Sequence, residues 1–363
     1  MAERTLHSFM PGSILGIDIG TTSAKIVQLR KDASGPVLET YGVIDLSSYA
    51  DLAEGERVKL RPERSGAALL DLLSAVAGNA RAGGMAVQLS STFTALLDTP
   101  RRDREQMARI IPLEAKRLVP VPLDNVSLDW RVLDKPPEER PFEQAESGAS
   151  LVPQTQKVLL IAVRNEALDE CRAVADSAHL SILLYEVEMF SAARATKKLP
   201  GESVLLIDLG ASATKVYALD EHGEPTLAHL IDKGGAAISR LILESGLSHF
   251  SEAETLKRKE GVEGSTQAAG IAAKELTGVF EEALRLVRDY DALGKTRIRR
   301  AVLTGGGALM PGIAALAHQT LGLEVELASP LLSVQGPEIL ADRLADVGPL
   351  YAVATGLALR ALQ

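Results

Sequence analysis

The stretch that decides the fold is Asp18-Ile19-Gly20-Thr21-Thr22-Ser23-Ala24-Lys25, and its pattern returns at Asp208-Leu209-Gly210-Ala211-Ser212-Ala213-Thr214-Lys215. Each copy follows a short apolar run that predicts a buried strand, and each leads into a second β-rich stretch. The shared unit is a strand, a tight turn of glycine and small residues, and another strand, with an aspartate where the turn begins. One such unit is compatible with an ordinary β-turn, whereas two indicate a duplicated fold whose halves face one ligand.

The chemistry of the repeated turn suits a phosphate chain. Glycine lets backbone N–H groups approach an anion because no Cβ stands in the way. Hydroxyl groups from Thr21, Thr22 and Ser23 add donors in the first copy, and Ser212 adds one in the second. An aspartate at a strand end can hold a hydrated Mg²⁺. The pattern predicts that the two turns bind one phosphate chain from opposite sides.

A third element comes late in the chain, between Arg299 and Gly312. An apolar strand there runs into Gly305, Gly306 and Gly307, and a helix is expected to follow. A helix N-terminus behind glycines is a favourable site for an anion or a nucleotide. Strand–glycine–helix turns are also common as plain connections. This glycine turn indicates a nucleotide site because it follows the two hairpins.

Composition bounds the class of protein. The 363 residues are 46% hydrophobic, so the chain can bury a large core in two or more domains. A formal net charge of −9 argues against nucleic acid as the main partner. The single cysteine, Cys171, excludes an intramolecular disulfide and fits a reducing cytoplasm. No run approaches the ~20 apolar residues of a membrane span, and the first residues lack a signal-peptide pattern, so we expect a cytoplasmic protein without direct membrane insertion.

Hydrophobic periodicity predicts helices between the motifs. We expect one over residues 66–80, and one over 102–118 that Pro112 kinks or ends early. Another is expected over 165–178, with Asn165 as its N-cap. These helices alternate with predicted strands, which is typical of an α/β fold.

Two further segments have distinctive compositions. Residues 134–156 are rich in Pro, Glu, Gln, Ser and Gly and predict a long mobile loop between two strands. The apolar stretch 350–360 predicts a helix buried on a sheet, because Arg360 alone gives too little polar face for a membrane-surface helix.

The order of hairpin, hairpin and Gly-Gly-Gly resembles the actin and sugar-kinase superfamily of ATPases. The resemblance implies an α/β, actin-like fold of two duplicated RNase H-like halves around a nucleotide cleft, with ATP and Mg²⁺ as cofactors. A kinase acting on a sugar or on acetate would need a dedicated acid or base in an acceptor pocket, and the sequence offers no support for one.

Within that superfamily the chain resembles the type IV pilus assembly PilM family. The passage Val119-Pro120-Val121-Pro122-Leu123-Asp124-Asn125-Val126-Ser127-Leu128-Asp129-Trp130 is similar to the family pattern, as are Thr304 to Ala308 and Tyr351 to Arg360. The alternative is FtsA, a cell-division actin homologue that shares the inserted 1C subdomain. FtsA usually continues through a linker to a basic amphipathic helix, whereas this sequence ends at Gln363, directly after the core pattern.

The resemblance also implies a division into subdomains. The first half (1A) is expected over 13–92, completed by 180–200, with the 1C subdomain inserted at 93–179. The second half (2A) is expected over 201–233, completed by 298–363, with subdomain 2B at 234–297.

Roles for the phosphate motifs follow from the resemblance. Asp18 is expected to hold Mg²⁺ through water, and the other contacts of the first hairpin are expected from Gly20, Thr21, Thr22, Ser23 and Lys25. Asp208 is expected as the second metal contact and a catalytic residue, with further contacts from Gly210, Ala211 and Ser212. Lys215 lies farther along its strand, where it could be merely solvated.

The remaining site residues are implied in the same way. Glu254 is expected to accept from ribose hydroxyls, with Lys257 and Arg258 flanking the ribose or adenine, although Glu and Lys three residues apart also form common helix-surface pairs. Gly305, Gly306 and Gly307 are expected to pass close to the α-phosphate and adenine. Glu188 stands where the superfamily places a water-orienting catalytic residue, and a helix-start acid explains it equally well.

The function implied is that of a nucleotide-binding component of the inner-membrane assembly platform of a type IV pilus or a related type II secretion system. The chain would bind ATP with at most slow hydrolysis. It would be recruited to the inner face of the cytoplasmic membrane by the N-terminal cytoplasmic tail of a PilN-like protein. The resemblance also suggests contacts with pilus motor ATPases and leaves self-association open.

Overall fold

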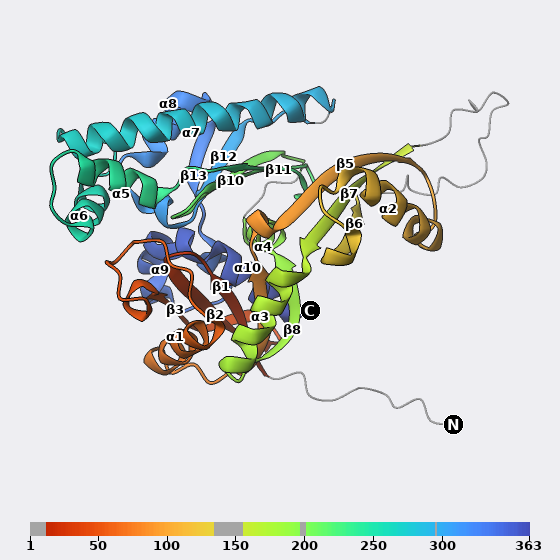
Figure 1. The fold of residues 1–363 in the computed structure, drawn as a ribbon, viewed down its shortest axis with the longest axis horizontal. Coiled ribbons are helices and arrows are strands. Elements are labelled where there is room, and N and C mark those ends of the chain that lie inside the picture. Colours follow the sequence, from red (N-terminus) through yellow and green to blue (C-terminus); the bar gives the residue numbers. More distant parts are fainter. Residues whose placement is uncertain (1–11, 134–154, 197–200, 295) are drawn as a thin grey trace.

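The computed structural model describes residues 12–133, 155–196, 201–294 and 296–363, so the predicted loop over 134–156 lies almost entirely outside the described residues. The described residues form two mixed sheets and a smaller antiparallel sheet (Figure 1). Among the helices of this part of the chain, none is long and apolar enough to cross a membrane.

The two mixed sheets have the same topology. The first has the order β3-β2-β1-β4-β8 and the second the order β11-β10-β9-β12-β13. In each, the first three strands are antiparallel and the last two join in parallel. The strands of the first sheet are β1 (Ser13–Ile19), β2 (Ser23–Asp32), β3 (Gly35–Asp45), β4 (Ala82–Val87) and β8 (Ser181–Val187). Those of the second are β9 (Val204–Leu209), β10 (Thr214–Leu219), β11 (Pro225–Ile231), β12 (Arg300–Thr304) and β13 (Glu324–Leu327).

Helices cover these sheets. Those of the first half and the insertion are α1 (Pro62–Ala75), α2 (Arg104–Leu118), α3 (Asn165–Ser177) and α4 (Glu188–Ala195). Those that follow are α5 (Gly235–Glu244), α6 (Phe250–Glu260), α7 (Gln267–Ala292), α8 (Ile313–Leu321), α9 (Ala341–Val347) and α10 (Ala352–Ala361). The 26-residue α7 lies along the outer side of the second sheet (Figure 1).

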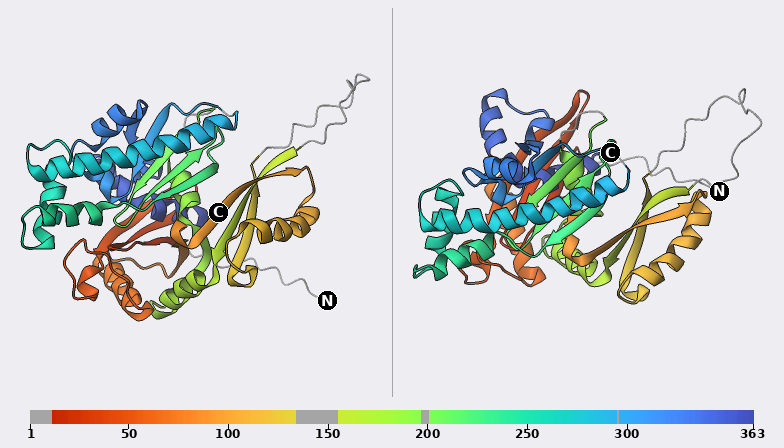
Figure 2. Two further views of the ribbon diagram at one scale, coloured as in Figure 1. Left: turned by 45° about the horizontal axis from the view of Figure 1, so that its top comes forward. Right: turned by 90° about the horizontal axis from the view of Figure 1, so that it is seen from above.

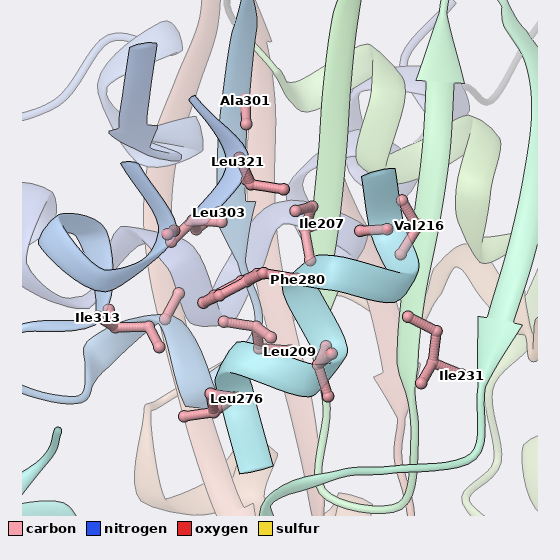
Figure 3. Close-up of a cluster of buried hydrophobic side chains, with 14 of the residues drawn as sticks. Ile207, Leu209, Val216, Ile231, Leu276, Phe280, Ala301, Leu303, Ile313 and Leu321 are labelled. Carbon is pink, nitrogen blue, oxygen red and sulfur yellow. The ribbon is translucent and has the colours of Figure 1, made fainter. Parts of the chain in front are cut away.

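Alternation along β9 shows how the second sheet is buried on both faces. Leu205, Ile207 and Leu209 belong to a core cluster with residues of α7 such as Phe280 (Figure 3). Val204 and Leu206 belong to a different cluster, which includes Phe190 of α4. A strand with two apolar faces is typical of a sheet covered by helices on both sides. The Asp208 carboxylate follows directly at the end of this rigid strand.

Helices α4 and α10 lie at the centre of the molecule and contact each other closely. A Cβ on Gly356 of α10 would overlap the backbone oxygen of Ser191 on α4, and one on Gly16 of β1 would overlap that of Ala354. The apolar stretch 350–360 is therefore a buried helix, as predicted. Its assignment with residues 298–363 to the second half needs correction, because α10 packs against β1 and β4 of the first sheet.

The inserted sheet consists of β5 (Thr92–Pro100), β6 (Val126–Val132) and β7 (Thr155–Arg164), in the order β5-β7-β6. It projects to one side of the two mixed sheets (Figure 2). Val158, Leu160 and Ala162 pack against α2, while Leu159 and Ile161 on the other face join the cluster that contains Leu206 and Tyr217.

Helix α3 packs mainly with the first half, and only its start contacts the inserted sheet. Its Val174 and Ala175 share a core cluster with α1 and β1. This packing favours an insertion that ends with β7, earlier than the predicted boundary at residue 179.

Three predicted helices differ in detail. The helix expected over 66–80 is α1, which starts at Pro62, because proline suits the first helical position. It ends by Ala75, and Ala77 then adopts a positive φ of 53°. Pro112 lies inside α2 and does not end it. Proline has no N–H, so the Ala108 carbonyl loses its partner in the helix. Ala108 is exposed, so water can bond to this carbonyl instead.

Asn165 is not the N-cap of α3. Arg164 occupies that position, and no side chain caps the helix. The Asn165 amide instead donates to the backbone oxygen of Asp124 (3.0 Å), and its Oδ1 accepts from Ser127 Oγ (2.8 Å). The side chain therefore fastens the start of α3 to the inserted sheet.

Candidate functional site

The two hairpins place the same pair of residues in the same register. Asp18 pairs with Lys25 across β1 and β2, and Asp208 pairs with Lys215 across β9 and β10. The Lys25 Nζ to Asp18 Oδ2 distance is 3.7 Å, and the Lys215 Nζ to Asp208 Oδ2 distance is 3.1 Å. Each half of the molecule thus brings one carboxylate and one ammonium group to the end of its central strand.

The turns of the hairpins meet each other. The hydroxyl oxygens of Thr21 and Ser212 lie 2.5 Å apart and form a hydrogen bond between the two halves. Each turn is braced from behind, because the Thr21 oxygen accepts from Val58 N–H (2.7 Å) and the Gly210 oxygen accepts from Gly235 N–H (2.9 Å). Hydroxyl groups from both halves therefore meet at one point.

The glycine turn after β12 closes another side of the site. Gly305 has a φ of +82°, and a Cβ there would overlap the Asp208 carboxylate. A Cβ on Gly307 would press on Leu209. A Cβ on Gly306 would meet only the end of the Leu350 side chain, at 3.6 Å. Gly305 and Gly307 are thus required by the protein's own packing, whereas Gly306 borders open space.

Glu254, Lys257 and Arg258 of α6 form a network with each other. Lys257 Nζ donates to Glu254 Oε2 (2.6 Å), Ser239 Oγ (2.8 Å) and the Gly235 oxygen (2.9 Å), which uses all three of its protons. Burial favours a higher pKa for Glu254, but the Lys257 charge and hydrogen bond outweigh it, so the pKa of Glu254 is lowered. Lys257 therefore orders the start of α5, and flanking a ribose would require it to break one of these bonds.

Glu254 keeps room for one more donor. Its Oε2 accepts from Ser239 and Lys257, and its Oε1 accepts from Arg258 Nε at 2.8 Å. A carboxylate offers about four lone-pair sites, so one remains on Oε1. The predicted contact with a ribose hydroxyl is compatible with this geometry.

Arg258 also reaches the first half. Its Nη1 lies 2.7 Å from Glu54 Oε1, in the segment that leads to α1. Both side chains are more than half exposed, so this ion pair spans the cleft at the surface and contributes at most about 1 kcal/mol.

Lys215 is not a solvated side chain, which decides the alternative that the sequence left open. Its ammonium lies 2.9 Å from Glu188 Oε2 and 3.1 Å from Asp208 Oδ2. Burial disfavours the charged form, but the carboxylates of Asp208 and Glu188 outweigh it and raise the pKa of Lys215 well above its ordinary value. The lysine is therefore a cation held between two carboxylates.

Glu188 begins α4 and is buried. Its Oε1 accepts from the backbone N–H of Leu89 at 2.7 Å, while Oε2 accepts from Lys215. Each oxygen has one partner, and a carboxylate offers about four lone-pair sites, so the predicted contact with a water is compatible with this geometry.

One cavity of about 800 Å³ joins these elements. Every residue that we predicted for nucleotide, metal or catalysis lies on its wall. The wall also contains Lys215, to which the sequence analysis gave no site role, and residues that it did not single out, namely Gln88, Arg57, Glu54 and Asp232. The repeat itself signals Lys215, because it occupies the same position in the second motif as Lys25 in the first.

The site fits Mg²⁺ only in part. Among the described residues, no group of three or more His, Cys, Asp or Glu side chains could hold a metal ion. Asp208 is already bonded to Lys215, whereas Asp18 has the longer contact with Lys25. Of the two predicted metal contacts, Asp18 is the one that a hydrated ion could reach at lower cost.

Two equivalent sheets and a cleft walled by paired hairpins and a glycine turn define an actin-like ATPase fold. A family model for type IV pilus assembly protein PilM matches residues 16–362, and the chain belongs to that family. A PilM–PilN type IV pilus biogenesis complex has a chain with a TM-score of 0.78 and 23% identity, covering 96% of this chain and 98% of that chain. The predicted fold and family are confirmed.

More distant proteins share the fold. The ethanolamine utilization protein EutJ from Carboxydothermus hydrogenoformans has a TM-score of 0.53 and 16% identity, over 97% of this chain and 90% of that one. MreB 5 of Spiroplasma citri, bound to AMPPNP, has a TM-score of 0.50 and 13% identity, over 96% and 95%. The cell division protein FtsA of Bacillus subtilis (strain 168) is 29% identical over 160 residues, which are 38% of this chain and 36% of FtsA.

Proposed function

We propose that this protein binds ATP between its halves as the nucleotide-binding component of a type IV pilus, or related type II secretion, assembly platform. The observation that carries the proposal is the contact between Thr21 and Ser212, with a matched Asp–Lys pair behind each turn. Donors from both halves meet there, where a phosphate chain would bridge them. At most slow hydrolysis is expected, because Leu89 N–H and Lys215 already engage the Glu188 carboxylate, which leaves fewer lone pairs to orient a water.

Mg²⁺ would enter with the phosphates. Asp18 is then the side chain that holds the hydrated ion, while Lys25, Thr22 and Ser23 stand around the phosphate chain. The ion supplies charge neutralisation of the phosphates when it is bound.

Calorimetric titration with MgATP tests this proposal. Asp18→Ala should weaken MgATP binding by about tenfold or more, because it removes the carboxylate that would hold the hydrated Mg²⁺. Asp98→Ala is the matched control, since Asp98 pairs with Lys157 on the inserted sheet. Unchanged affinity in Asp18→Ala, with Asp98→Ala equal to wild type, would contradict the proposed site.

The proposed protein partner is the cytoplasmic tail of a PilN-like membrane protein, which would recruit the chain to the inner face of the membrane. The PilM–PilN complex supports this partner. An extended tail can bind by adding a strand to an open sheet edge. Within the described residues, no strand pairs with the outer edge of β8, and Leu183 on that strand is 53% exposed as an apolar anchor.

Deleting the predicted insertion, residues 93–179, is one way to test where the tail binds, but a point substitution is a better test. That removal would take Leu159 and Ile161 out of a central cluster, together with all of α3. Leu183→Asp should instead weaken binding of a PilN-tail peptide, measured by fluorescence anisotropy. Leu241→Asp on α5, which is 39% exposed, should bind the peptide as wild type does. Equal binding by both variants would place the tail on another surface.

FtsA-like cell division is the second candidate, favoured by the 29% identity with FtsA over 160 residues. A pilus-platform protein of net charge −9 should not sediment with anionic vesicles on its own. Co-sedimentation would favour the FtsA role.

A further inference from the structure

Lys215 occupies a bridging position at the floor of the cleft. It lies on β10 of the second sheet with Asp208 beside it, while Glu188 comes from the start of α4, directly after β8 of the first sheet. Its ammonium is within 3.1 Å of one oxygen of each carboxylate. The exposed fractions of the Lys215, Glu188 and Asp208 side chains are 19%, 4% and 9%, so water screens this cluster weakly.

The cluster carries two negative charges and one positive charge. Without the lysine, two buried carboxylates would face each other and also repel an incoming phosphate chain. Two carboxylates that face one cation could also hold a divalent ion, because Mg²⁺ prefers oxygen ligands. The ammonium stands in the position that such an ion would take.

Comparison with Lys25 shows that a lysine held between two carboxylates occurs in the second hairpin and not in the first. It has the same register position in the first hairpin, but it faces the single carboxylate of Asp18, at 3.7 Å. The two lysines therefore differ in surroundings although the motif repeats. Lys25 can turn toward a phosphate, whereas Lys215 is held by two acceptors.

We propose that Lys215 is a resident counter-ion of the cleft, which does for Glu188 and Asp208 what a bridging metal ion would do. This inference rests on the proposed nucleotide binding. It follows that the second half needs no metal of its own, and that ATP affinity depends on Mg²⁺ less than it would without the lysine. Lys215 is thus a positioning residue for both carboxylates.

The test measures ATP affinity with Mg²⁺ and with EDTA and compares the ratio of the two affinities among variants. Lys215→Gln makes the local charge one unit more negative and should raise the ratio by about tenfold or more. Glu188→Gln makes it one unit more positive and should lower the ratio below wild type. The double variant restores the wild-type charge, so its ratio should return toward the wild-type value.

Lys25→Gln is the matched control. It removes a phosphate contact and should weaken ATP binding with and without Mg²⁺, with little change in the ratio. If Lys215→Gln fails to fold, Glu188→Gln and the double variant still decide the question. Ratios that do not follow the charge of the cluster would overturn the inference, whereas absence of ATP binding by the wild-type protein would overturn the proposed function itself.

Discussion

Replacing Gly16 with alanine tests how the first phosphate hairpin is anchored. Gly16 lies on β1, two residues before Asp18, and faces the backbone of α10. An added Cβ would overlap the Ala354 oxygen and lie 2.6 Å from the Ala358 nitrogen. Overpacking typically costs about 1–3 kcal/mol, and a buried helix backbone yields less than a side chain does, so we expect a loss of about 3 kcal/mol or more.

Gly84→Ala is the matched control, because Gly84 on β4 is the register partner of Gly16. Its Cβ would meet the ends of two leucine side chains, Leu184 at 3.1 Å and Leu357 at 3.4 Å. These can adjust, so we expect a loss below about 1 kcal/mol. Urea unfolding followed by circular dichroism measures both. Equal midpoints for the two variants would refute the close contact between β1 and α10.

Three further predictions follow from single sites. Gly306→Val should abolish ATP binding in calorimetry while thermal unfolding stays near wild type, and Gly306→Ala should have a smaller effect; normal binding by the valine variant would make this turn a plain connection. Burial raises the pKa of Cys171 from 9.0 to about 11. Because the thiolate is the reactive form, at pH 8 iodoacetamide should label the native chain about 100-fold more slowly than the urea-unfolded chain. Equal labelling rates would show an accessible thiol. Arg131→Ala removes an ion pair with Glu224 (2.7 Å) and a contact over the Phe190 ring (4.2 Å). Hydrogen exchange in β6 should therefore become faster while ATP affinity stays as in the wild type. An exchange rate equal to wild type would mean that Arg131 does not hold the inserted sheet.

The residues that line the cleft could be predicted from the sequence because their motifs are local. Asp18 and Lys25 are seven residues apart on one hairpin, so turn chemistry alone fixes their pairing, and the repeat transfers the same geometry to Asp208. Whether the two hairpins face each other is not a local property. It was predicted from their order and their resemblance to a superfamily, and the contact between Thr21 and Ser212 supports it.

The errors concern contacts between distant segments. The sequence leaves open whether Lys215 is solvated, because Glu188, its partner, lies 27 residues away in the chain. The resemblance assigns residues 298–363 to the second half, although Gly16 and Gly356 place α10 against β1 and α4. Asn165 has the composition of a cap, yet hydrogen bonds to the inserted sheet engage its side chain. In each case tertiary contacts decided between alternatives that the local sequence left equal.

The most direct test of nucleotide binding in this cleft is a crystal structure of the protein with a non-hydrolysable ATP analogue and Mg²⁺. We predict that the terminal phosphates lie between the Thr21 and Ser212 hydroxyls, with the ribose beside Glu254, the base next to Gly306, and Lys215 still bonded to Glu188 and Asp208. A nucleotide bound elsewhere, or an empty cleft at saturating analogue concentration, would contradict the account.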